Sequence, residues 1–423
     1  MTVAVAAGRF EITGWMQQYV NVAVFLLGAL CLTAPTGYSI GAALLLLGSS
    51  VLLLRRPSLA LSPRDWLVIG AMAFFAVVGM GDAWWGGASS REMDKPVRFL
   101  LAIPALLLVM AYPPRRSWLW AGLALGAIGA GGLATWQFFI EGARRASGLT
   151  QTIQFGNIAL LLGVLCVAGM GWAWGRSRRH AWLALLALGA LGGVVASLLS
   201  GSRGGWVGIP LILWVLYRGY GREFALRWRL AALLSVVLMA GAVYAIPQLG
   251  VQVRVDQAVS QLGSYLNGEG RTSSVGVRFE MWKGATVVGW NNPLLGVGIA
   301  NYEPAMAELA ERGVIVDKAG TFGHAHNEFF DTWAKRGALG LGALLLIYGL
   351  PLRFFAAGLT DADLSRRALA VAGTLLSVTY IDFSLTQGFL SHNSGVMVYA
   401  FWLAVLWGIF RRTATEGAVE RKT

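Results

Sequence analysis

Two histidines in one polar stretch are the residues best suited to acid–base chemistry. His324 and His326 lie in TFGHAHNEFFDTWAKRGALGLG (residues 321–342), although the whole chain has only four histidines. An unperturbed pKa near 6.5 keeps much of a histidine neutral at physiological pH, so it can accept a proton. His326 precedes a helix predicted over 327–336, whose positive end favours a neutral imidazole. The pattern indicates His326 as a general base, with His324 and Asn327 as supporting residues.

Arginines surrounded by glycine or aromatic residues offer the complementary chemistry, the binding of phosphate. Arg203 lies in SGSRGGW (residues 200–206), and Arg278 opens the stretch from GVRFEMW to NNPLLGVGIANY. The guanidinium fork pairs bidentately with phosphate oxygens, and glycines let backbone N–H groups approach an anion closely. Arg145 in another loop is a weaker candidate of the same kind.

Each of these residues also has an ordinary structural explanation. His326 and Asn327 could do no more than cap the following helix, since asparagine is a preferred cap. Arg203 could be an interfacial arginine that extends toward water among turn glycines. Arg278 could be a solvated helix residue paired with Glu280 or lying in the surroundings of Lys283. Asp82 and Asp382 lie near span ends, where an ionisable residue suggests function, but the sequence gives them no role.

The elements that position these residues are those of a membrane protein. The chain is 56% hydrophobic and 13% charged, with a mean hydropathy of +0.61, and a span needs about 20 mainly apolar residues. Arginine-rich loops alternate with loops poorer in basic residues, which predicts that both termini lie in the cytoplasm. We predict twelve spans, near 16–34, 38–54, 66–81, 97–112, 118–139, 156–174, 181–200, 206–220, 230–247, 335–352, 367–386 and 394–410.

The predicted fold is therefore an all-α polytopic membrane protein with one large external loop. Residues 1–247 hold nine spans, residues 248–333 form the external loop of short helices that carries the site, and residues 334–423 hold three spans and a cytoplasmic tail. Within the loop we expect one helix with apolar residues from Val255 to Leu266, a second from Ser274 to before Asn292, and a third over 302–312.

Other classes of function fit the sequence less well. The net charge of +13 is distributed in short clusters between apolar runs, with no basic stripe for nucleic acid. Cys31 and Cys166 both fall in predicted spans, so no disulfide framework or CxxC site is expected. No third ligand is spaced to join the two histidines around zinc, and neither a metal nor another cofactor is expected.

Three motifs occur in an order that resembles one family. SRGGW at Arg203, the stretch from Arg278 through NPLLGVGI, and His326-Asn327 followed after nine residues by Gly337-x-x-Gly340 resemble the O-antigen ligase and polymerase superfamily of bacterial envelope glycosyltransferases. The resemblance covers residues 200–342 in detail and the N-terminal half only by topology. It implies a GT-C-like fold in the bacterial inner membrane, with the active site on the periplasmic side.

The resemblance also implies a reaction and its substrates. The ligase of this superfamily transfers O-antigen from undecaprenyl diphosphate to a sugar of the lipid A core, by metal-independent transfer with inversion. His326 would then accept the proton of the attacking hydroxyl, and Arg203 and Arg278 would hold the leaving diphosphate. The spacing of the histidine motif resembles the ligase more than the polymerase, which joins repeat units on the same carrier.

Two readings from other classes stay open at this point. A transporter or flippase also has twelve spans and few charges, although it would call for inverted repeats and broken helices at mid-membrane. An assembly protein whose external loop only binds partners is the other alternative.

Overall fold

Every regular element in the computed structural model is a helix, within the residues that it describes (2–202, 204–246 and 251–420, a few side chains excepted). The first half of the chain forms α1 (Thr2–Ala29), α2 (Gly37–Gly48), α3 (Val51–Arg55), α4 (Pro63–Trp85), α5 (Ser90–Ala111), α6 (Arg116–Phe139), α7 (Thr152–Trp174) and α8 (Arg179–Ser200). The second half forms η1 (Gly204–Trp206), α9 (Ile209–Gly219), η2 (Gly221–Glu223), α10 (Leu226–Ala245), α11 (Val251–Leu266), α12 (Ser274–Asn291), η4 (Ile299–Asn301), α13 (Tyr302–Glu311), α14 (Asp317–Gly320), α15 (Glu328–Ala356), α16 (Leu364–Thr386), η5 (Phe389–Ser391) and α17 (Asn393–Glu420).

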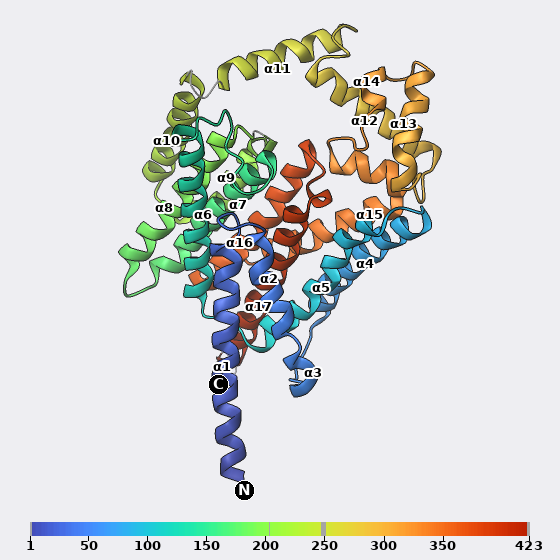
Figure 1. The fold of residues 1–423 in the computed structure, drawn as a ribbon. Coiled ribbons are helices and arrows are strands. Elements are labelled where there is room, and N and C mark those ends of the chain that lie inside the picture. The colour runs from blue at the N-terminus through green and yellow to red at the C-terminus, as the bar shows by residue number, and fades with distance from the viewer. Residues whose placement is uncertain (1, 203, 247–250, 421–423) are drawn as a thin grey trace.

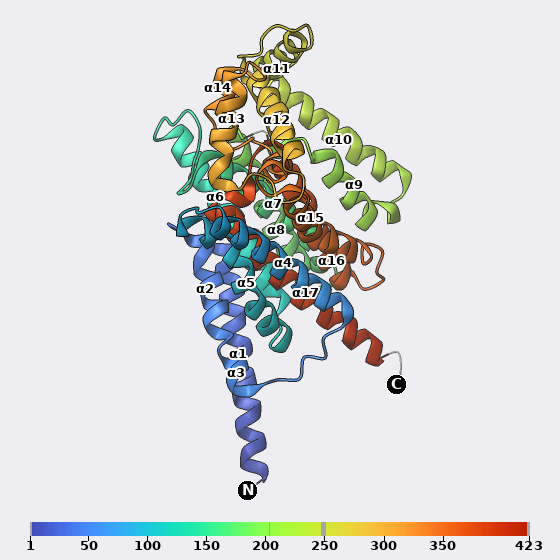
Figure 2. The same cartoon turned by 90° about the vertical axis from the view of Figure 1, so that its right-hand side faces the viewer.

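The bundle is organised around three helices that are buried along most of their length, α7, α16 and α17. Helices α6 and α8 pack beside α7, while α4, α5 and α15 pack together on the other side of α16 and α17 (Figure 1). The start of α1 and the end of α17 lie at the same end of the bundle in both views (Figures 1 and 2). The predicted cytoplasmic location of both termini stays a prediction.

Eight helices in the described part of the chain are long and apolar enough to cross a membrane: Gly37–Arg55, Pro63–Trp85, Arg116–Phe139, Thr152–Trp174, Arg179–Ser200, Glu328–Ala356, Leu364–Thr386 and Asn393–Arg411. The polytopic class is confirmed, but the count of twelve is not. Helix α9 has only 11 residues, α5 carries charged side chains through its first turns, and α10 carries Arg227 and Arg229 near its start. Length separates α9 from the eight and charge separates α5, whereas α10 includes side chains that the structure does not describe, so its span is not tested.

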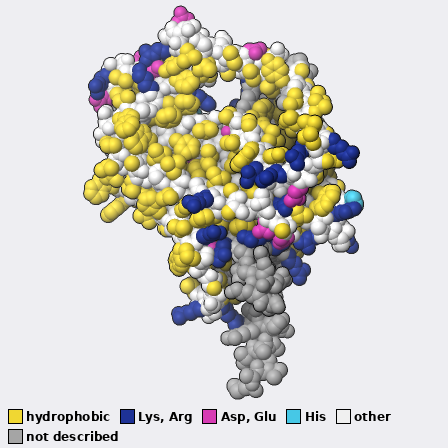
Figure 3. All heavy atoms as spheres, turned by 180° about the vertical axis from the view of Figure 1, so that it is seen from behind, with side chains coloured by type: hydrophobic (Ala, Val, Ile, Leu, Met, Phe, Trp, Pro, Cys, Tyr) yellow, Lys and Arg dark blue, Asp and Glu magenta, His cyan; other side chains and the backbone are white. Residues whose placement is uncertain are grey.

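Hydrophobic side chains cover much of the molecular surface, as a lipid-facing protein requires (Figure 3). Exposed apolar residues include Trp214 and Leu211 on α9, and Leu233 and Leu238 on α10. A water-soluble protein rarely exposes so large an apolar surface. These faces are therefore suited to contact with acyl chains.

The segment from α11 to α14, predicted to be the external loop and called the external layer below, folds as a separate small helical layer. Helix α11 extends from α10 across to α12, above the bundle (Figure 1), and α12, α13 and α14 share a second hydrophobic core that includes Met281, Met306 and Ile315. The three predicted helices are thus confirmed within two residues at each described boundary, except that α11 begins at Val251. Ser273 caps α12 by accepting a hydrogen bond from Gly276 N–H at 3.1 Å.

Helix α15 is interrupted at Gly337, which has φ 57° and ψ −153°. Only glycine adopts that backbone region readily. The turn segment after α12 satisfies groups that the break leaves unpaired: Ala338 N–H donates to Pro293 O at 2.8 Å, and Val297 N–H donates to Ala334 O at 3.0 Å. The NPLLGVG motif therefore has a structural role here, because it closes the break between the polar start of α15 and its membrane-spanning part.

Candidate functional site

A cavity of about 470 Å³ lies where the external layer meets the bundle. Residues from α4, α5, η4, α15 and the connection between α16 and α17 line it, together with the loop that carries the two histidines. Its polar lining comprises Glu92, Lys95, Gln151, His324, His326, Glu328, Asp331, Thr332, Lys335, Arg336, Gln387, Ser391 and His392. The cavity therefore combines bases, acids and cations next to an apolar wall.

His326 is held in an unusual backbone conformation at the edge of this cavity. Its φ is 50°, a left-handed value that is uncommon for residues other than glycine. Its Nδ1 lies 2.8 Å from Oε1 of Gln387, and its ring centroid is 4.1 Å from that of His324. The Gln387 amide nitrogen in turn lies 3.3 Å from Nε2 of His392. A carbonyl oxygen can only accept, so the proton of His326 resides on Nδ1 and its Nε2 has a lone pair.

The surroundings keep both histidines of the loop neutral. Burial lowers the pKa of His326, the hydrogen bond to Gln387 opposes this shift, and the charge of Arg278 adds to it. Burial and the neighbouring His326 lower the pKa of His324 to about 4. From the sequence, we expected the helix dipole to keep the His326 imidazole neutral. In the structure, burial is the largest cause of its lowered pKa. A neutral His326 is the form that can accept a proton.

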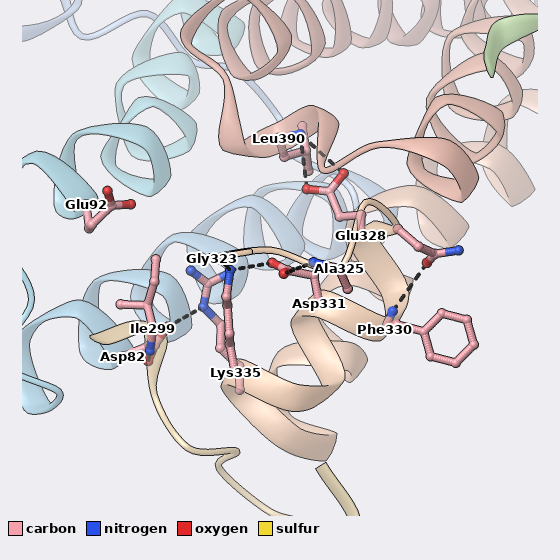
Figure 4. A network of polar contacts seen from close by, with 12 residues as sticks. Asp82, Glu92, Ile299, Gly323, Ala325, Glu328, Phe330, Asp331, Lys335 and Leu390 are labelled. Atoms are coloured by element: carbon pink, nitrogen blue, oxygen red, sulfur yellow. Dashed lines mark hydrogen bonds and ion pairs between the residues drawn. The ribbon is translucent and has the colours of Figure 1, made fainter. Parts of the chain in front are cut away.

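Asn327 and Glu328 hold the histidine loop against the end of α16. The Asn327 carboxamide oxygen accepts from Phe329 and Phe330 N–H, which confirms it as the cap of α15, and its Nδ2 donates to Leu385 O at 3.0 Å. The buried Glu328 carboxyl group accepts from Ser384 Oγ and from the backbone N–H groups of Phe389 and Leu390, at 2.9 to 3.2 Å. Figure 4 shows the bonds from Leu390. Gln387 is therefore fixed from both sides, because Asn327 holds Leu385 before it and Glu328 holds Phe389 and Leu390 after it.

Two ion pairs neutralise the cations at the floor of the cavity. Lys335 Nζ donates to Asp331 at 2.8 Å and to Gly323 O at 2.9 Å, and Asp331 also accepts from Ala325 N–H (Figure 4). Arg336 Nε donates to Asp82 at 2.6 Å. Asp82, for which no role was predicted, also accepts from Ile299 N–H at 3.1 Å. It thus joins α4 to the external layer beside the cavity.

Arg278 does not line the cavity, but it is close enough to His326 to lower its pKa. Burial lowers its own pKa, and it makes no hydrogen bond or ion pair with any residue that the structure describes. The alternative of a pairing with Glu280 is wrong, because Glu280 is bound by Arg271 at 2.7 Å and by Tyr265 at 3.0 Å. A half-buried guanidinium without an internal partner is suited to an anionic ligand.

Arg203 lies outside the described residues, and the structure does not test its predicted role. Its neighbour Gly204 packs so closely on Thr386 that a β-carbon there would lie 2.1 Å from the Thr386 hydroxyl. Ser202 Oγ donates to Asn157 Oδ1 at 2.9 Å. The glycine motif therefore contacts the end of α16, one residue before Gln387.

Arg145 is exposed and donates from Nε to Ser200 O at 2.7 Å. Burial of its inner part and the nearby Arg254 lower its pKa. It is thus anchored to the first residue of the glycine motif, and it does not line the histidine cavity. No three His, Cys, Asp or Glu side chains are grouped to hold a metal ion, as far as the described residues go.

Several residues at the cavity were not singled out by the sequence motifs. Glu328 follows the His-Asn pair and Asp331 is three residues further along, so both lie on the first turns of the predicted helix. That position could have indicated that they lie near the histidines. Gln387 and His392 come from a separate connection between two spans, and only the presence of a further histidine near a span end points to them.

Comparison with known proteins supports the family resemblance. Residues 190–345 match the family model described as O-antigen ligase. The chain is also similar to an uncharacterized protein of Haemophilus influenzae, 28% identical over 383 residues that cover 90% of this chain and 95% of that protein. The family match covers the glycine motif, Arg278, the histidine loop and the first part of α15. It confirms the resemblance to the O-antigen ligase and polymerase superfamily.

Proposed function

We propose that this chain, whose residues 190–345 match the superfamily, acts as the O-antigen ligase of lipopolysaccharide biosynthesis. The observation that carries the proposal is the His326 imidazole, neutral and held by Gln387 at the edge of a cavity of about 470 Å³. The donor would be O-antigen on undecaprenyl diphosphate and the acceptor a sugar of the lipid A core. The cavity would then face the periplasm and both termini the cytoplasm of a bacterial inner-membrane protein.

In this mechanism the acceptor hydroxyl attacks the anomeric carbon from the side opposite the diphosphate. A bond forms between that oxygen and the carbon, and the bond from the carbon to the phosphate oxygen breaks, with inversion. His326 Nε2 takes the hydroxyl proton, because Nδ1 is already protonated toward Gln387. Such a base contributes about 10²–10⁴-fold to the rate.

The leaving diphosphate requires positive charge that is not already neutralised. Lys335 and Arg336 are paired with Asp331 and Asp82, so they are poorly placed to give up their charge to a ligand. Arg278 has no such partner within the described chain and lies close to His326. We therefore assign Arg278, together with Arg203 of the glycine motif, to the diphosphate. His324, Asn327 and Arg145 support this arrangement without taking part in proton transfer.

The test is transfer of lipid-linked polysaccharide onto rough lipopolysaccharide by the purified full chain, with EDTA present. His326→Ala should lower the rate about 10²–10⁴-fold, and Arg278→Lys should fail as Arg278→Ala does if bidentate geometry matters. Arg312→Ala, an exposed residue of the same layer, is the control and should retain full activity. Near-normal transfer by His326→Ala would defeat the assignment.

The same assay separates the alternatives. Growth of the glycan on its carrier, with none on lipopolysaccharide, would indicate the polymerase. Movement of the lipid-linked glycan across vesicles by His326→Ala at the wild-type rate, without transfer, would indicate a transporter or flippase.

A further inference from the structure

The polar residues that line the histidine cavity fall into two groups, which differ in whether their hydrogen-bonding atoms are already used. The first group consists of the four charged residues that α15 contributes, Glu328, Asp331, Lys335 and Arg336. Each of them bonds another group of the protein, at distances from 2.6 to 3.2 Å. A ligand that bonded these residues would first have to break those contacts.

The second group keeps its hydrogen-bonding atoms available. Gln151, just before α7, and Ser391, at the end of η5, are exposed, and neither side chain has a hydrogen-bond partner within the described chain. His392 uses only Nε2, which lies 3.3 Å from the amide nitrogen of Gln387, and its Nδ1 bonds no described residue. Gln151, Ser391 and His392 together are called the open wall below.

The open wall offers donors and acceptors side by side. A glutamine amide and a serine hydroxyl each do both, and the Nδ1 of His392 donates, because its Nε2 accepts from Gln387. A sugar hydroxyl also donates and accepts, whereas a phosphate or carboxylate oxygen only accepts. Phe75 and Pro96 add an apolar surface to the same cavity, which suits the C–H face of a sugar ring.

The charges beside the open wall cancel. Lys95 Nζ lies 3.1 Å from a carboxylate oxygen of Glu92, and their side chains are 26% and 31% exposed. Figure 4 shows Glu92 on α5, with no bond to the network of Asp331 and Lys335. Burial, the charge of Lys95 and the nearby His326 lower the pKa of His392, so its imidazole is neutral. A wall without net charge favours an uncharged sugar over a phosphate.

The proposed base connects the open wall to the reaction. Attack with inversion places the acceptor and the diphosphate on opposite sides of the anomeric carbon. Arg278, assigned to the diphosphate, acts on the pKa of His326 but does not line the cavity, so the cavity is left to the acceptor. One amide, that of Gln387, contacts both His326 and His392, at 2.8 and 3.3 Å. The base and the open wall are therefore held in one fixed relation.

We infer that the open wall is the acceptor subsite, which binds hydroxyls of an uncharged sugar ring and presents another hydroxyl of that ring to His326. The inference rests on the proposed function and adds to it the residues that hold the acceptor. Gln151, Ser391 and His392 bind and orient the sugar. The proton of the attacking hydroxyl still goes to Nε2 of His326, and these three residues take no part in that transfer.

The experiment measures transfer by the purified full chain, with the concentrations of rough lipopolysaccharide and of the lipid-linked donor varied separately. Gln151→Ala/Ser391→Ala should raise the KM for the acceptor roughly 25-fold, at about fivefold for each lost hydrogen bond, and should leave the KM for the donor within about twofold. The matched control is Gln257→Ala/Ser260→Ala, two exposed residues of α11 that do not line the cavity. It should change either KM less than about twofold.

A binding measurement without donor makes the result independent of turnover. Core oligosaccharide released from rough lipopolysaccharide is the probe, and calorimetry should show the same roughly 25-fold loss in the double variant. Gln151→Trp places a larger side chain in the lining and should abolish this binding. Equal Tm values for the wild type and both variants show that the fold is intact.

A charge-free variant tests the class of acceptor group. Glu92→Gln/Lys95→Gln removes both charges together and should change the KM for the acceptor less than about threefold. A larger loss than in Gln151→Ala/Ser391→Ala would indicate a charged acceptor group and would overturn the inference. An unchanged KM for the acceptor in Gln151→Ala/Ser391→Ala, or an equal rise in both KM values, would overturn it while the proposed function stands. Absence of transfer by the wild type would instead overturn the proposed function itself.

Discussion

The Gln387 amide oxygen and the His326 Nδ1 atom are 2.8 Å apart, although the residues are separated by 61 positions in the chain. The other end of the same amide approaches Nε2 of His392 at 3.3 Å, so the amide nitrogen donates there and the oxygen faces His326. This fixes the tautomer and the orientation of the proposed base. Gln387 is thus a positioning residue that need not touch the substrate.

Replacing Gln387 should move the pH profile of transfer in directions that depend on charge. His326 acts when neutral, so the rate falls as the pH drops through its pKa. Gln387→Glu places a carboxylate beside the imidazole, raises its pKa, and should shift the acid limb upward by about one pH unit. Gln387→Leu removes a hydrogen bond that raises the pKa, so the acid limb should move downward while kcat falls roughly 10–100-fold.

The charge-matched control is Gln252→Glu on α11, which should leave the pH profile unchanged. Other groups face His326 as well, namely His324, His392, Arg278 and Asp331, and none of them changes in these variants. If Gln387→Glu and Gln387→Leu lose activity at the same acidic pH, while His326→Ala is inactive, Gln387 does not position His326. His326 would still be the proposed base.

Glu328 should matter more for activity than its position in a membrane helix suggests. Glu328→Ala leaves the buried N–H groups of Phe389 and Leu390 without their acceptor, at about 1–3 kcal/mol each. The connection that carries Gln387 then loosens. We expect kcat to fall at least as much as for Gln387→Leu, with a lower Tm. Glu308→Ala on α13, a side chain 68% exposed, should change neither value; an unaltered kcat in Glu328→Ala would count against this anchoring.

The external layer should depend on the ion pair between Arg271 and Glu280. Burial alone would raise the pKa of Glu280, but hydrogen bonds from Arg271 and Tyr265 outweigh it and lower that pKa. The pair therefore stabilises the fold above the ordinary glutamate pKa near 4.5, and this contribution is lost as the pH falls below it. Arg271→Ala should cost about 2 kcal/mol at pH 7, less than for a fully buried pair, because the arginine is 40% exposed.

A double-mutant cycle with Glu280→Gln measures that coupling by thermal unfolding at pH 7 and pH 4. The exposed pair Arg312 and Glu308, 3.5 Å apart, is the matched control and should give a coupling close to zero. Equal coupling energies for the two pairs, or a coupling that grows on acidification, would contradict the prediction.

Gly337 should tolerate no side chain, whereas Gly342 on the same helix should accept one. A β-carbon at Gly337 would lie 2.5 Å from the Leu294 carbonyl carbon, at a φ of 57°. Gly337→Ala should therefore destabilise the protein by at least about 3 kcal/mol. Nothing lies within 4 Å of a β-carbon at Gly342, so Gly342→Ala should be neutral or slightly stabilising. Thermal unfolding of the two variants in one detergent checks both statements, and similar Tm values would refute the explanation.

Features that depend on neighbours in the chain could be predicted from the sequence. Asn327 caps its helix, as the sequence suggested, and Ser273 likewise caps α12, because a cap contacts the next two or three residues. The bounds of α12 and α13 follow from the same local signals. His326 could also be identified from the sequence, because a histidine pair in a polar stretch beside an apolar run is a local pattern.

Features that depend on distant segments could not be predicted. The pairing of Asp82 with Arg336 joins residues 254 positions apart, and Gln387 comes from a connection with no motif of its own. The pairing of Glu280 with Arg271 rather than Arg278 depends on how α11 packs on α12. The count of twelve spans is not confirmed, and apolar content alone does not reveal that α9 is short or that α5 begins with a charged segment.

We expect the break at Gly337 also to set how deep the protein sits in a bilayer. The part of α15 after Gly337 is about 28 Å long at 1.5 Å per residue, close to the roughly 30 Å of a hydrocarbon layer. The polar turns that carry Glu328 and Asp331 then emerge at the lipid surface, and the sugar end of a lipid-anchored substrate would reach His326 while its tail stays among the acyl chains. Bilayers with longer acyl chains would submerge these turns, so acyl-chain length itself becomes a control on turnover.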